Sequence, residues 1–73
     1  MNANAKYVPK TEAVLEIMQR TGVGRFVVER QINKMEESGL ISFVDNPRDF
    51  RQKLISRENV EAVVQALSPE LFP

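Results

Sequence analysis

The stretch TEAVLEIMQRTGVGRFVVERQINKMEESGL, residues 11–40, decides the fold. It predicts two short helices separated by a turn at residues 21–24. Thr11 is the expected N-cap of the first helix, and Gly22 is expected to end it, because a glycine commonly follows the last helical turn. The buried face of this helix follows the i, i+3, i+4 spacing of an amphipathic helix. Its members are Val14, Leu15, Ile17 and Met18.

The second predicted helix covers residues 25–38 and ends at Gly39. At about 100° per residue, one narrow arc contains Val28, Ile32 and Met35. The opposite face presents mostly polar side chains, with Lys34 on its shoulder: Phe26, Arg30, Asn33 and Glu37. The interval between the two helices is too short for anything but a tight turn, so they must cross at a steep angle. This is the pattern of a helix-turn-helix.

Strand and turn residues follow the second helix. Residues 40–44 are rich in strand-forming types, residues 45–49 form a dense turn cluster, and residues 50–55 alternate as a returning strand. This hairpin occupies the position of a wing. Ser56 is the expected N-cap of a third helix, whose buried stripe contains Val60, Val63, Val64 and Leu67.

The predicted fold is therefore mainly α with a small β-hairpin, arranged as a winged helix-turn-helix. A single domain is expected over residues 7–67, in which residues 7–9 form a short extended entry. Short tails are expected at residues 1–6 and 68–73. In the second tail, Leu71 and Phe72 either cover the edge of the core or contact a neighbouring copy of the chain.

Composition excludes several classes of function. The 73 residues contain no Cys and no His, which removes disulfides, thiolate ligands and imidazole catalysis. No paired carboxylates and no phosphate-binding glycine loop are evident, so we expect neither an enzyme nor a cofactor or metal site. The start of the chain has no signal-peptide pattern, and no apolar run approaches the ~20 residues of a membrane span. A soluble, cytoplasmic protein is expected.

The outer face of the second helix points to DNA. Arg30 and Asn33 have the chemistry for bidentate contacts to guanine and adenine, and a helix of this kind fits the major groove. Phe26 either meets a thymine methyl or packs back against the turn. Glu29 either pairs with Arg25 on the surface, which we favour, or discriminates against a wrong base. Ten Lys and Arg balance ten Asp and Glu, whereas DNA-binding domains usually carry a basic surplus.

Several short runs together resemble the small MerR-like winged-helix proteins, and among them the excisionase-type members of phages and mobile elements. The runs are YVP (residues 7–9), TEA (11–13), GV (22–23), GLI (39–41), Arg51 and LISRENVEA (54–62). Their order and spacing carry the resemblance. Helix two is longer than is typical of the excisionase-like members, and in this it is similar to the MarR-type winged helices.

The resemblance implies that the second helix enters the major groove and that the hairpin lies over the backbone or the adjacent minor groove. Carried over residue by residue, the DNA-binding positions are Arg25, Phe26, Arg30, Asn33 and Lys34 on the helix, and Arg48, Arg51 and Lys53 on the hairpin. A recombination directionality factor, a transcriptional regulator, or both would use such a site, with double-stranded DNA, further copies of the chain and an integrase as expected partners. The alternative is a winged-helix module that binds protein and has no DNA affinity of its own.

Overall fold

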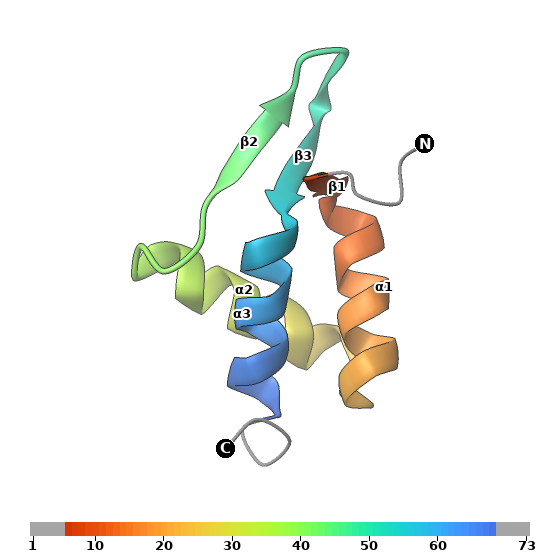
Figure 1. Ribbon diagram of the computed structural model, residues 1–73, viewed down its shortest axis with the longest axis vertical. Coiled ribbons are helices and arrows are strands. Elements are labelled where there is room, and N and C mark those ends of the chain that lie inside the picture. The colour runs from red at the N-terminus through yellow and green to blue at the C-terminus, as the bar shows by residue number, and fades with distance from the viewer. Residues whose placement is uncertain (1–5, 69–73) are drawn as a thin grey trace.

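The structure is a computed structural model that describes residues 6–68. Helices and strands follow one another in the order β1 (Tyr7–Pro9), α1 (Lys10–Thr21), α2 (Arg25–Glu37), β2 (Phe43–Asn46), β3 (Asp49–Ser56) and α3 (Arg57–Leu67). Figure 1 shows the three helices gathered at one end, with α2 crossing behind α3, while the β2–β3 hairpin projects beyond them. The expected helix-rich fold with a hairpin is confirmed.

A glycine in the left-handed conformation ends α1. Gly22 has a φ of 75°, and its N–H donates to the carbonyl of Met18 at 2.8 Å. The Thr21 hydroxyl tightens the same turn, since it donates to the Ile17 carbonyl at 2.7 Å and accepts from the Val23 N–H at 3.2 Å. These bonds satisfy polar groups that the end of a helix leaves unpaired. The predicted turn between the two helices is confirmed.

The predicted start of α1 is wrong. The helix begins at Lys10 with Pro9 as its N-cap, and no side chain caps it. Pro9 still belongs to β1, where it pairs with Leu54, so the chain passes directly from strand to helix and Thr11 lies inside the first turn. Leu15 also differs from expectation, because it is 47% exposed, outside the stripe formed by Ala13, Val14 and Ile17.

The sheet has three antiparallel strands in the order β1–β3–β2, one strand more than the predicted hairpin. The expected extended entry is β1, in which Val8 lies opposite Ile55. The Lys6 carbonyl accepts a further bond from the Arg57 N–H at 2.8 Å. At the other edge of the sheet, β2 begins only at Phe43. Residues 40–42 connect the end of α2 to this strand and are not paired with β3. The sheet therefore fixes the start of α1 against the end of β3, at the base of the hairpin.

The core lies between the three helices and the inner face of the sheet. Ile17, Ile32, Ile55 and Val60, one from each of four elements, are fully buried. Burial of such a side chain contributes about 1.5–3 kcal/mol, so the predicted stripes of α1, α2 and α3 account for most of the packing. No polar or charged side chain is buried within residues 6–68.

The third helix follows the prediction closely. The Ser56 hydroxyl caps it by accepting from the Asn59 N–H at 3.1 Å, and Val60, Val63 and Val64 are buried. Leu67 packs partly buried against the core. Leu71 and Phe72 lie outside the described residues. None of the helices in the described part of the chain has the length and apolar character needed to cross a membrane.

Candidate nucleic-acid interface

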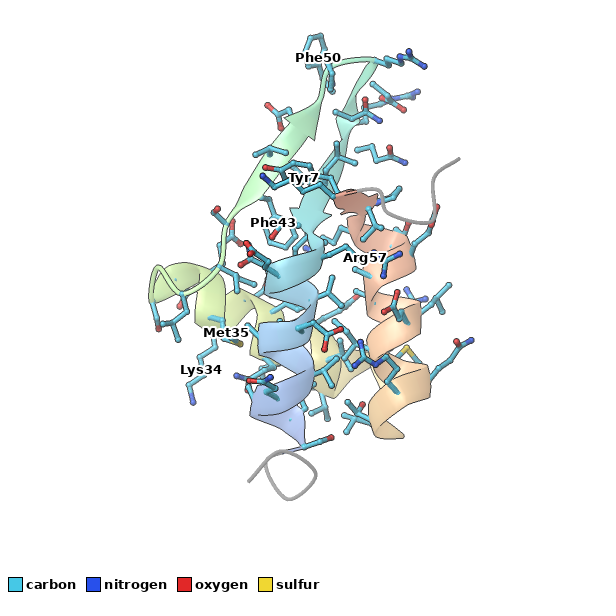
Figure 2. All side chains as sticks on the ribbon, viewed as in Figure 1. Tyr7, Lys34, Met35, Phe43, Phe50 and Arg57 are labelled. Atoms are coloured by element: carbon cyan, nitrogen blue, oxygen red, sulfur yellow. The ribbon has the colours of Figure 1, made fainter. Side chains whose placement is uncertain are left out.

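The outer face of α2 is solvent-exposed along its length. Val28, Ile32 and Met35 hold the inner face of the helix in the core, and the side chains on the opposite face therefore point outward. The exposed set includes the five residues predicted on this helix, Arg25, Phe26, Arg30, Asn33 and Lys34. Figure 2 shows Lys34 extending away from the body of the molecule.

Phe26 is not part of the core. Its side chain is 74% exposed, which removes the alternative that it packs back against the turn. The guanidinium carbon of Arg30 lies 5.7 Å from the centre of the Phe26 ring, within the range of a cation–π contact. The two residues are four apart on one helix, so the Arg30 head group lies beside the ring on the exposed face of α2.

Other charges on α2 reduce its positive character. Arg25 pairs with Glu29 at 3.9 Å, which is the surface pair favoured from the sequence. Glu36 and Glu37 add two exposed carboxylates at the end of the helix. The start of the helix is more favourable to an anion, because Gly24 offers no capping side chain and the first turn contains no acidic residue.

The hairpin cations are exposed, and two of the three are already paired. Lys53 Nζ lies 2.5 Å from Asp45 Oδ1, and Arg51 Nε lies 3.2 Å from Asp49 Oδ1. The hydrogen bond from Lys53 to Asp45 is the main reason why the pKa of Lys53 is raised, with the charges of Asp45 and Glu36 acting in the same direction. Arg51 keeps a 92% exposed side chain despite its pair. The three hairpin cations predicted to contact phosphates are therefore exposed, and neighbouring carboxylates partly neutralise two of them.

The sheet brings one further cation to the hairpin. An open pocket of about 450 Å³ lies between the start of α1 and β3. It is lined by Lys10, Thr11, Asp49, Arg51, Gln52 and Lys53. Lys10 also lies over the ring of Phe43, with its Nζ 5.1 Å from the ring centre. The sequence prediction omitted Lys10, because only the pairing of β1 with β3 places it beside Arg51 and Lys53.

The tip of the hairpin carries a second residue that the sequence prediction omitted. Phe50 is 77% exposed, between Asp49 and Arg51. The alternation of residues 50–55 predicts that Phe50 lies in a strand, but it does not predict that the side chain is exposed. Within residues 6–68, Asp and Glu do not gather into any group of three that could hold a metal ion.

Comparison of the chain with protein-family models, with curated proteins and with solved structures finds no match in any of the three.

Proposed function

We propose that the chain binds double-stranded DNA, with α2 in the major groove and the hairpin on the phosphate backbone. The observation that carries the proposal is the outer face of α2, where Arg30 stacks on an exposed Phe26 beside Asn33. Arginine and asparagine are the side chains that make bidentate contacts to guanine and adenine, and an exposed aromatic ring can contact a thymine methyl. A solvated helix face has no need of an exposed Phe.

The arrangement of elements supports a winged helix-turn-helix as the scaffold of this site. A short turn joins α1 to α2, the hairpin follows α2 directly, and α3 packs against both helices. In helix-turn-helix proteins the second helix lies in the groove with its N-terminal residues against the bases. Arg25 and Phe26 occupy that end of α2, where the helix dipole and the free N–H groups favour a phosphate.

The excisionase resemblance extends this proposal to a cellular role. The protein would act as a recombination directionality factor or a transcriptional regulator in the cytoplasm, binding as several copies on DNA and, in the first case, beside an integrase. Both roles need the same contacts to DNA. Neither requires catalysis, and we propose none.

A protein-binding module is the second candidate, and two observations favour it. The pairs Lys53–Asp45 and Arg51–Asp49 hold hairpin cations that phosphates would otherwise attract. Leu40, like Phe26 and Phe50, is a largely exposed apolar side chain of the kind that anchors protein interfaces. DNA remains the better candidate, because the exposed polar face of α2 combines donors suited to base edges with an aromatic ring.

Gel-shift titration on random-sequence duplex at low and moderate salt tests the proposal. Affinity should fall steeply as salt rises, because neutralising phosphates releases counterions. A variant with Arg30→Ala and Lys34→Ala should bind more weakly, whereas Gln65→Ala, on the exposed side of α3, should bind like the wild type. Absence of binding even at low salt would contradict the proposal and favour the protein-binding module.

A further inference from the structure

Phe50 is the most exposed large apolar side chain within residues 6–68, and the fold gains no packing from it. It stands three residues after Pro47, on the far end of the hairpin from the helices, as Figure 2 shows. A side chain in this position costs solubility. It is therefore a candidate for contact with something outside the chain.

The pairing of β2 with β3 is irregular beside Phe50. In the regular part of the hairpin, Asp45 of β2 pairs with Lys53 of β3. The next residue of β2, Asn46, pairs with Asp49. Three residues of β3 therefore have no pairing partner in β2: Phe50, Arg51 and Gln52. Extra residues in one strand bend it and redirect its side chains, which is why bulges occur where a side chain is aimed at a partner. Phe50 therefore lies outside the regular pairing of β2 with β3.

The tip is nevertheless held in place by its own hydrogen bonds. The Asn46 side chain donates to Gln52 Oε1 at 2.6 Å and accepts from the Arg48 N–H at 2.9 Å. The Asp49 carboxylate accepts from the Arg51 N–H at 3.0 Å. These bonds fix the backbone on both sides of Phe50, so the ring is presented by an ordered turn.

The charges around the ring indicate the partner. Arg48 and Arg51 are both exposed beside Phe50, and Lys53 follows on the same strand. Asp49 pairs with Arg51 and Asp45 with Lys53, so Arg48 is the cation beside the ring for which no carboxylate pair is found among residues 6–68. An apolar side chain flanked by cations suits the minor groove of DNA, where arginine is attracted by the negative potential and apolar wedges enter between base pairs. A single Phe presents little apolar area to a membrane or to a protein pocket, whereas one ring suffices to separate a base step.

We propose that Phe50 inserts between base pairs from the minor groove and kinks the DNA, while Arg48 and Arg51 hold the adjacent phosphates. This inference rests on the proposed function, since α2 in the major groove would bring the hairpin to the neighbouring groove. Wedges of this kind bend duplexes by about 20–90° toward the major groove. Flexible pyrimidine–purine steps such as TA are the expected sites of insertion.

The test uses the full chain and a duplex that contains several TA steps, each with 2-aminopurine as its purine and with a fluorophore at each end. Binding is followed by gel shift, bending by energy transfer between the ends, and unstacking by the rise in 2-aminopurine fluorescence. The wild type should bend the duplex and raise the fluorescence. Phe50→Ala should lose both signals while its affinity falls by less than about threefold, because phosphate contacts dominate nonspecific affinity.

Two variants serve as controls. Phe50→Leu keeps an apolar wedge and should retain part of the bend, whereas Leu40→Ala removes another exposed apolar side chain and should change neither signal. If the wild type binds without bending, or if Phe50→Ala bends as the wild type does, the inference is wrong and the proposed function stands. If the wild type does not bind the duplex, both fail. Phe50-dependent binding to anionic vesicles without a DNA bend would assign the residue to a membrane instead.

Discussion

Arg30 illustrates how a single contact can prepare a side chain for recognition. A free arginine on a helix surface samples many rotamers, and binding has to order them at a cost in entropy. In this chain the ring of Phe26, one turn earlier, already lies beside the guanidinium. The planar fork of donors is then partly oriented before it meets a base.

Substitutions at this pair separate contact from orientation. Arg30→Ala should weaken binding to a selected site by about 1–3 kcal/mol, because a base contact is lost. Phe26→Leu keeps Arg30 and removes only the ring, so it should cost less, about 0.5–1 kcal/mol, the value of an exposed cation–π contact. Fluorescence anisotropy with the selected duplex measures both, with Gln65→Ala as the control. Unchanged affinity for Arg30→Ala would remove this residue from the interface.

Gly22 is the second residue on which the fold depends. At a φ of 75° a side chain is strained even where space is free, and a Cβ at Gly22 would meet no atom within 4 Å. Gly22→Ala should therefore lower the free energy of unfolding by about 1–2 kcal/mol through backbone strain alone. Gly22→Asn should lose less, since asparagine tolerates this conformation better. Urea denaturation of the two variants makes the comparison, and equal losses would contradict a conformational cause.

At the scale of elements, the hairpin contains cations suited to bind phosphate and carboxylates that partly neutralise them. Asp45→Asn removes one negative charge and releases Lys53 from its partner. Affinity for any duplex should rise by roughly three- to tenfold, and the salt dependence should steepen as Lys53 gains a phosphate contact. Glu58→Gln on α3 is the matched control, since it changes the net charge equally at another element. If both variants bind alike, Lys53 does not contact DNA.

The helices could be predicted because their signals are local. The stripe of Val28, Ile32 and Met35, the turn at Gly22 and the cap at Ser56 each depend on residues within a few positions. The strand Tyr7–Pro9 could not be identified in this way. It has only three residues, one of them a proline, and its partners lie nearly fifty positions later in β3. Because that pairing is long-range, the helix start at Lys10 was also missed.

The same distinction between local and long-range signals applies to the candidate site. The exposed face of α2 follows from helical periodicity, and all five of its predicted residues lie on the surface. The hairpin depends on register, which periodicity does not give. The register that puts Asp45 opposite Lys53 shows that Lys53 is paired, and the irregularity after Asp45 shows that Phe50 lies outside the regular pairing. Only the third strand brings Lys10 to the pocket.

At the scale of the whole molecule, the net charge is zero, and part of that balance lies in ion pairs outside α2. A cluster of two cations and two carboxylates ties α1 to α3: Arg20 contacts both Glu16 and Glu61, and Arg57 contacts Glu16 at 2.8 Å. These charges largely cancel one another, and they belong to α1 and α3 rather than to α2. The potential of a surface depends on the charges near it, so a neutral total is compatible with DNA binding by α2.

This cluster should make the stability of the fold depend on pH. The hydrogen bond from Arg20 lowers the pKa of Glu61 below its ordinary value of 4.5, against the opposing effect of partial burial. The unfolded chain therefore binds more protons than the folded chain in the window just below pH 4.5, and the stabilisation is lost as the pH falls through the folded pKa. Because both partners are exposed at the surface, the effect should be no more than about 1 kcal/mol.

Glu61→Gln tests this dependence. The variant should lose up to about 1 kcal/mol at pH 7 and should lose less than the wild type on acidification, because one of the groups that titrates on unfolding is gone. Urea denaturation at neutral and acidic pH measures the difference. Glu37→Gln, which removes a carboxylate from α2 without touching Arg20, separates the loss of one negative charge from the loss of this contact. If the two variants behave alike, the contact between Arg20 and Glu61 contributes nothing specific to the stability of the fold.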